Sequence, residues 1–147
     1  MDSKMVFVLL IAVFVALSGC AQPQTGGTGN NDGAGDGGDL VVGTFTVTRT
    51  DDGFSPTPLT IKKGSTVTFV NNSSEPSWPA SAMHPTHTVY PGSDIQKCGS
   101  DEQGSIFDAC KGLENGESFS FTFNEAGEWG YHDHLDAKKF GKIIVME

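Results

Sequence analysis

Positive charge is scarce in this sequence. Its 147 residues include nine Lys and Arg residues against eighteen Asp and Glu residues, which gives a formal net charge of −9 at pH 7. An acidic surface repels phosphate backbones and anionic headgroups, so this balance argues against binding to nucleic acid and against direct adhesion to anionic lipid. The same surface remains compatible with cationic metals and with basic protein partners. A chain of this length is expected to hold one folded domain.

Long apolar runs are also missing. The longest, residues 6–17, has twelve residues behind Lys4, which is too short to span a bilayer but has the size of a signal-peptide core. It ends in the tetrapeptide Leu-Ser-Gly-Cys20, which resembles the lipobox of prokaryotic lipoproteins, where cleavage precedes the cysteine and the cysteine carries lipid. The alternative is an ordinary secretory signal in which Cys20 stands by chance. Both interpretations export the chain.

The segment after Cys20 lacks the large apolar side chains that folding requires. Residues 21–39 are dominated by Gly, Asn, Asp, Gln and Thr, so burial cannot offset the entropy of ordering them. We therefore predict a lipoprotein signal peptide over residues 1–19, a flexible tether over residues 20–39 and a folded domain over residues 40–147. The expected location is outside the cytoplasmic membrane, in the periplasm or on the cell surface of a prokaryote, with a lipid anchor in the membrane.

Cysteine is rare, with three in the chain. If Cys20 carries lipid, Cys98 and Cys110 remain, and two cysteines in an oxidising compartment most often form a disulfide. Such a bond would stabilise the domain by about 3 kcal/mol through loop closure. The alternative, in which one of them is a metal-binding thiolate, is disfavoured because each has a partner in the other.

Helical periodicity is absent from the folded part, where hydrophobicity repeats every second residue. Short strands are expected at residues 41–49, 59–61, 66–71, 87–90, 119–123, 128–132 and 142–146, with a hairpin turn at 62–64. This pattern, without a convincing amphipathic helix, predicts an all-β fold built as a Greek-key antiparallel β-sandwich with an aromatic core.

The chain has only four histidines, and they fall in two pairs. His84 and His87 belong to a His-Pro-Thr-His motif, whereas His132 and His134 flank Asp133 at the expected end of a strand. Residues two apart on a strand point to the same face, so His132 and His134 form a paired-imidazole face. Such a face is typical of metal binding.

Two segments resemble the cupredoxin family. Residues 54–71 are similar to the first half of a cupredoxin domain and residues 119–145 to its second half, and together they span nearly all of residues 40–147. Residues 129–145 resemble the last metal-binding loop of the plastocyanin and amicyanin type, although Asp133, Asp136 and Lys139 stand where that loop has Cys, His and Met. Residues 85–90 match the segment that holds the family's first His ligand, which gives His87 this role.

The resemblance implies a copper site, but one without the thiolate that makes blue copper blue. Four neutral imidazoles suit Cu2+, and Zn2+ is the less favoured alternative. The expected metal ligands are His84, His87, His132 and His134. Asp133 and Glu75 are expected just outside the ligands, Asp133 as a solvated carboxylate or one that orients a ring N–H. Trp78 is expected to pack against the site, and Met83 to pack rather than to bind Cu(I).

These features predict an extracytoplasmic, lipid-anchored protein that binds, buffers or delivers copper, or assists electron transfer. Its expected partner is a redox protein or a copper donor or acceptor. Two alternatives stay open. One is a copper enzyme similar to multicopper oxidases, whose His-x-His pairs bind catalytic copper, assembled here between subunits. The other is an adhesive or structural sandwich whose histidines are incidental. No recognisable nucleophile motif supports a hydrolytic triad.

Overall fold

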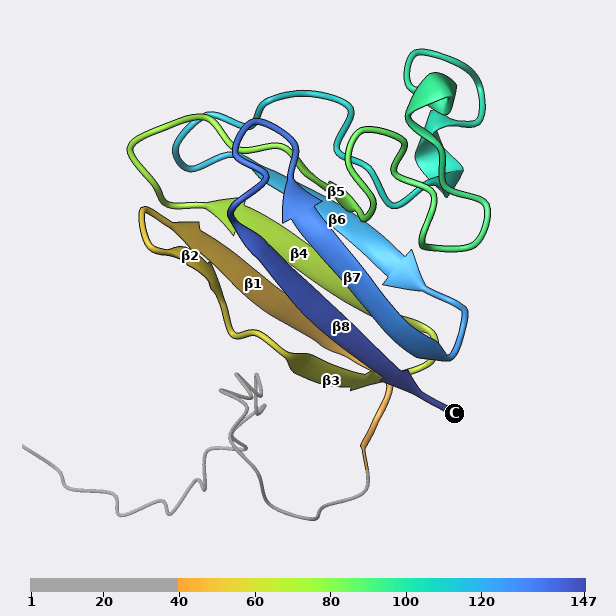
Figure 1. The fold of residues 1–147 in the computed structure, drawn as a ribbon. Coiled ribbons are helices and arrows are strands. Elements are labelled where there is room, and N and C mark those ends of the chain that lie inside the picture. The colour runs from red at the N-terminus through yellow and green to blue at the C-terminus, as the bar shows by residue number, and fades with distance from the viewer. Residues whose placement is uncertain (1–39) are drawn as a thin grey trace, which may run out of the picture. The chain divides into compact units, whose positions relative to one another are not determined.

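Two four-stranded sheets packed face to face make up the domain in the computed structural model, which describes residues 40–147 (Figure 1). The expected signal peptide, Cys20 and the tether lie outside the described residues. The first sheet has the order β2 (Gly53–Ser55), β1 (Thr44–Thr50), β4 (Ser65–Asn71) and β6 (Ser118–Phe123). The second has the order β3 (Leu59–Lys62), β8 (Phe140–Met146), β7 (Gly127–Asp133) and β5 (Pro79–Ser81). The all-β sandwich is therefore confirmed.

The alternation of residues along the strands explains why the sheets stack. Every second residue of β4 is buried, and in β6 Phe121 and Phe123 point inward while Ser118, Ser120 and Thr122 are exposed. Aromatic rings from the two sheets meet at the centre, where Phe69 and Tyr131 lie 5.1 Å apart between ring centroids in an edge-to-face arrangement. Edge-to-face pairs add about 0.5–1.5 kcal/mol to the burial of each ring. The predicted aromatic core is confirmed.

Strand pairing differs from the expected pattern in three respects. The pairs β1·β4 and β3·β8 run parallel, so the sandwich is not antiparallel throughout. The turn at residues 62–64 links β3 to β4, but these strands lie in different sheets, so it joins the two layers and is no hairpin. Residues 87–90 form no strand, and β5 at Pro79–Ser81 pairs with β7 instead.

A long insertion between β5 and β6 contains two short 3₁₀ helices, η1 (Ile95–Lys97) and η2 (Gln103–Ser105). The predicted disulfide between Cys98 and Cys110 is present and closes this segment. The chain then runs along the free edge of β5, where the Ser81 amide donates to the Phe107 carbonyl and the Ala109 amide donates to the Pro79 carbonyl. Asp108, between these contacts, is thereby fixed beside β5. Within residues 40–147, no helix is long and apolar enough to cross a membrane.

Candidate metal centre

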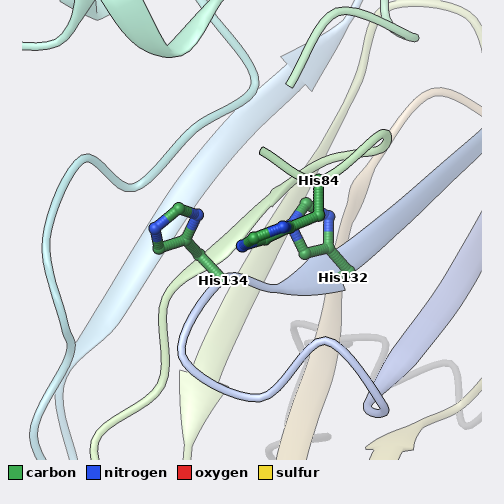
Figure 2. A group of neighbouring side chains, drawn as sticks. All are labelled: His84, His132 and His134. Carbon is green, nitrogen blue, oxygen red and sulfur yellow. The ribbon is translucent and has the colours of Figure 1, made fainter. Parts of the chain in front are cut away.

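The structure brings the four histidines together at one end of the sandwich. His132 lies near the end of β7, His134 follows that strand, and His84 and His87 lie in the loop after β5. One ring nitrogen each from His84, His132 and His134 falls within 4.8 Å of the others, and Figure 2 shows these three rings side by side. The ring of His87 completes the group, with its centroid 5.0 Å from that of His132 and 4.9 Å from that of His134.

His87 is completely buried and adopts a left-handed backbone conformation, with φ of 60°. A non-glycine residue in this region is held there by its surroundings at a cost of about 1–2 kcal/mol. Its Nε2 atom lies 2.9 Å from Nδ1 of His134, and its Nδ1 atom lies 2.5 Å from the Asp108 carboxylate. His87 is thus oriented on both sides, with Nε2 directed at the other imidazoles.

Asp108 is the important residue that the sequence did not reveal. It is buried, its carboxylate is hydrogen-bonded to His87 Nδ1, and it accepts hydrogen bonds from the Trp78 indole and from the Cys110 amide. Burial alone would raise the pKa of Asp108, but these three hydrogen bonds outweigh it and hold the pKa below its ordinary value. Asp108 is 21 residues from His87 in the sequence, and the path of the chain between β5 and β6 brings the two together. The sequence therefore marks Asp108 only as an acidic residue near a cysteine.

His132 is buried, and its ring has no hydrogen-bond partner within the described chain. Both of its ring nitrogens are buried, and neither forms a hydrogen bond. Burial, followed by the neighbouring His87, His84 and His134, lowers the pKa of His132 to about 4, so the ring is neutral at pH 7. A buried polar atom without a partner is rare and requires an explanation, and a bound ion is one. An unprotonated nitrogen surrounded by three imidazoles fits a metal ion.

His134 shares this environment. Burial and the nearby His87 and His84 lower its pKa as well. Its ring packs against Trp78, with 4.5 Å between the centroids, and the His134 amide donates to the Trp78 carbonyl. The prediction that Trp78 packs against the site is therefore confirmed, and Trp78 also links His134 to Asp108 through its indole N–H.

Asp133 does not have the place that was expected of it. It is fully buried, so it is not solvated, and its hydrogen bonds come from the Arg49 side chain and from the Trp78 and Leu135 amides. None of its hydrogen bonds within the described chain involves an imidazole, because Arg49 reaches across from β1 and takes one carboxylate oxygen. Asp133 holds the loop together, and the carboxylate that orients a ring is Asp108.

The side chain of Glu75 makes no hydrogen bond to any of the histidines in the described part of the chain. It is exposed, and among residues 40–147 only its backbone carbonyl is engaged, by the Asn71 amide group and the Ser73 hydroxyl. The expectation that its side chain supports the site stays a prediction, and no hydrogen bond of that side chain to a histidine supports it within residues 40–147.

His84 forms the outer wall of the site. It is exposed, and with His132, Met83 and Phe140 it borders a largely apolar surface hollow of about 380 Å³. Met83 and Phe140 are themselves 67% and 70% exposed, so Met83 does not pack in the interior as expected. The histidine group is therefore closed on the Asp108 side and open to solvent on the His84 side.

Comparison with known proteins agrees with this architecture. Residues 42–145 match the family model of copper binding proteins of the plastocyanin/azurin family. The chain is 35% identical over 95 residues to chloroplastic plastocyanin of Chlamydomonas reinhardtii, covering 63% of this chain and 58% of that protein. It is 30% identical over 94 residues to chloroplastic plastocyanin of Oryza sativa subsp. indica, covering 63% of this chain and 54% of that protein. The chain thus spans little more than half the length of these curated relatives.

Among solved structures, the fold is similar to a purple cupredoxin from Nitrosopumilus maritimus, with a TM-score of 0.52 and 22% sequence identity, covering 69% of this chain and 98% of that one. The family model spans most of the described domain, including both histidine pairs. The chain therefore belongs to the plastocyanin/azurin family of copper binding proteins, which makes copper its cofactor.

Proposed function

We propose that this chain is an extracytoplasmic, lipid-anchored copper protein whose metal is held by four histidines and by no thiolate. The observation that carries the proposal is His132, whose two ring nitrogens are buried without a hydrogen-bond partner among three other imidazoles. His84, His87, His132 and His134 would hold the ion. Copper in such a site supplies a one-electron couple, with nitrogen donors that favour Cu(II).

The chemistry of the loop supports a site without sulfur. Within residues 40–147 the two cysteines are joined to each other, so neither offers a thiolate. Asp133, at the position that the family gives to its cysteine, is engaged by Arg49 and by two backbone amides. Neutral imidazoles remain the donors, and they bind Cu(II) well and Zn(II) somewhat less well.

The open side of the site supports a role in handling copper. His84 is exposed at the surface, so a partner protein can approach the site there. Buffering or delivery of copper to a donor or acceptor protein is the function that we favour, and electron transfer with a redox partner is its nearest variant. The lipid on Cys20 would keep this exchange at the outer side of the membrane.

The test is copper analysis and electron paramagnetic resonance of the purified full chain. We expect one copper per chain, weak d–d absorption and the wide hyperfine splitting of an all-nitrogen site. His132→Ala should remove tight binding, and Glu75→Gln, which changes an exposed side chain, should not.

Three outcomes would contradict the proposal. An intense thiolate-to-copper absorption band would show a sulfur ligand. Magnetically coupled copper in an oligomer that consumes oxygen would favour the alternative of an oxidase assembled between subunits. Unchanged metal affinity in His87→Ala and His132→Ala would leave the histidines incidental, as in an adhesive or structural domain.

A further inference from the structure

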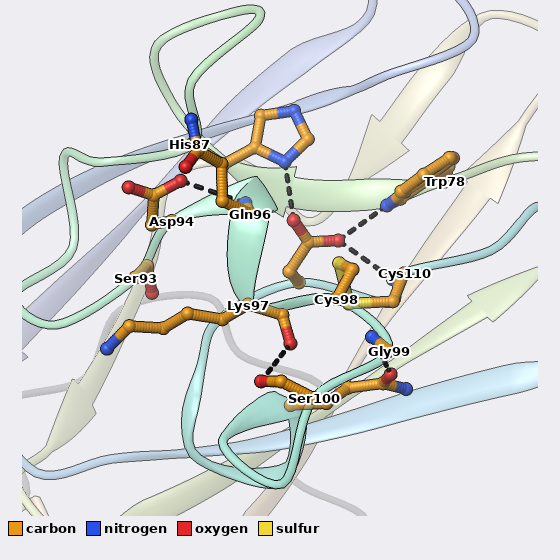
Figure 3. The surroundings of a disulfide bond; sticks show 12 residues. Trp78, His87, Ser93, Asp94, Gln96, Lys97, Cys98, Gly99, Ser100 and Cys110 are labelled. Atoms are coloured by element: carbon orange, nitrogen blue, oxygen red, sulfur yellow. Dashed lines mark hydrogen bonds and ion pairs between the residues drawn. A yellow bond between two sulfur atoms is a disulfide. The ribbon is translucent and has the colours of Figure 1, made fainter.

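We propose that Asp108 is a positioning residue of the copper site, which fixes the proton of His87 on Nδ1 and leaves Nε2 as the atom that binds metal. This inference rests on the proposed function, since it concerns the same four histidines. The geometry that carries it is a buried carboxylate that lies within hydrogen-bond distance of Trp78 Nε1, of the Cys110 amide and of Nδ1 of the predicted ligand His87 (Figure 3).

The insertion holds Asp108 rigidly. Its neighbours Phe107 and Ala109 are hydrogen-bonded to β5, and Cys110, two residues further on, is tied to Cys98 by the disulfide. The two carboxylate oxygens are engaged separately. Oδ1 accepts from Trp78 Nε1 at 2.6 Å and from the Cys110 amide at 2.8 Å, and Oδ2 faces His87 Nδ1. The indole and the amide are donors only, so Oδ1 has to be an acceptor.

The direction of the next hydrogen bond follows from this arrangement. Two N–H donors on Oδ1 favour the ionised carboxylate, which accepts and cannot donate, so we infer that His87 Nδ1 carries the proton. A neutral imidazole has one donor and one acceptor, so Nε2 of His87 has the free lone pair and accepts from Nδ1 of His134, 2.9 Å away. The chain of bonds runs from His134 through His87 to Asp108. The only unprotonated nitrogen of His87 is therefore the one that faces the other histidines.

Copper binding would use this lone pair. Metal-binding histidines commonly donate their second ring N–H to a carboxylate, which fixes the ring and strengthens the donor, and loss of such a partner weakens metal binding about 10–100-fold. Asp108 is held by the disulfide-closed segment, so the copper site depends on residues 98–110, which contain none of the four predicted ligands.

Asp108→Asn tests the proposal sharply, because it keeps the size of the side chain. Trp78 and Cys110 would keep the amide oxygen on their side, which places the new amide N–H₂ against His87 Nδ1. That amide can only donate, so the proton of His87 should move to Nε2 and block the metal-binding atom. The matched control is Asp101→Asn, which changes an exposed carboxylate of the same insertion.

The first measurement is the tautomer of His87 in the metal-free full chain, read from the ring ¹⁵N shifts in long-range ¹H–¹⁵N spectra. We expect the Nδ1–H form in the wild type and in Asp101→Asn, and the Nε2–H form in Asp108→Asn. A wild type with the proton on Nε2, or one tautomer shared by all three proteins, would overturn the proposal. If Asp108→Asn does not fold, the wild-type tautomer decides the question by itself.

The second measurement is Cu(II) affinity by competition with a chelator. Asp108→Asn should bind about 10–100-fold more weakly than the wild type, and Asp101→Asn should bind equally. Equal affinity in all three proteins would show that Asp108 does not position the ligand. A wild type that binds no copper contradicts the proposed function, whereas the tautomer in the metal-free protein still decides the role of Asp108.

Discussion

Two buried carboxylates have different tasks at this site. Asp133 receives N–H groups from Arg49 and from two backbone amides, so it fixes the loop that follows β7. Asp108 accepts from Trp78 and from the Cys110 amide and contacts His87 Nδ1, so in our proposal it fixes a predicted ligand. At the level of single residues, the hydrogen-bond partners of a carboxylate decide its role. The position of Asp133 between two histidines in the sequence does not.

Removal of the Asp133 carboxylate should destabilise the metal-free domain. Arg49 is 5% exposed and its ion pair with Asp133 is buried, so Asp133→Ala leaves an uncompensated charge in the interior. Breaking such a pair costs about 3–5 kcal/mol. Urea denaturation of the metal-free protein measures the loss. Glu75→Gln, an exposed control, should change the free energy of unfolding by less than about 0.5 kcal/mol. A loss below about 1 kcal/mol in Asp133→Ala would argue against this role.

The histidines should make the metal-free protein sensitive to acid. The pKa of His132 falls from 6.5 to about 4 on folding, so the unfolded chain takes up a proton more readily than the folded one. Stability contributed by neutral His132 is therefore complete above pH 6.5 and is lost as the pH falls toward 4. The depressed pKa of His134 acts in the same direction.

Urea denaturation of the metal-free protein between pH 7.5 and pH 4.5 measures this effect, because this range covers most of the His132 transition. The same series on His132→Gln is the comparison. The variant should lose less stability than the wild type over the interval, because glutamine does not titrate. Parallel curves for the two proteins would show that His132 is not held neutral by folding.

At the level of elements, the sequence predicted what depends on local pattern. The period-two alternation located most strands, and the spacing of His132 and His134 predicted that their imidazoles lie on one face. The alternation wrongly predicted a strand at residues 87–90, because tertiary contacts hold His87 in a left-handed conformation. It also missed the contact of Asp108 with His87 and the parallel pairs, because these depend on chain paths that no local pattern encodes.

The pairing of β7 with β8 depends on Gly141, which lies opposite Tyr131. A Cβ atom at position 141 would overlap the Tyr131 hydroxyl and lie 2.8 Å from Thr57 Oγ1. Because Tyr131 is fully buried in the aromatic core, it cannot move aside. Gly141→Ala should therefore lower the free energy of unfolding by about 1–3 kcal/mol, as overpacking typically does.

Thermal denaturation compares this variant with Gly104→Ala, where an added Cβ meets no atom within 4 Å. The control should unfold at nearly the wild-type temperature. Equal melting temperatures for Gly141→Ala and Gly104→Ala would show that the Tyr131 ring tolerates the extra methyl group.

At the level of the whole molecule, the three cysteines divide between two tasks. Cys98 and Cys110 close the insertion that supports the histidines, and Cys20 stands at the expected lipidation site. Both features agree with the proposal of an exported lipoprotein: the described domain has no free cysteine, and a lipobox-like motif precedes it. In the proposed extracytoplasmic location, the disulfide between Cys98 and Cys110 would persist.

The anchor can be tested separately from the copper site. In a bacterial host, the full chain should carry lipid on Cys20, partition into the detergent phase of a two-phase extraction and gain the mass of a lipid by mass spectrometry. Cys20→Ser should abolish both properties, whereas Cys98→Ser/Cys110→Ser, which leaves Cys20 in place, should keep the lipid. Each methylene group of a lipid chain that is buried in the membrane adds about 0.8 kcal/mol of binding free energy, so two acyl chains hold a protein stably. A lipid-anchored chain should therefore leave little protein in the aqueous phase. Wild-type protein that is cleaved elsewhere, carries no lipid and stays in the aqueous phase would show that Cys20 follows an ordinary secretory signal, and copper binding would be unaffected by that result.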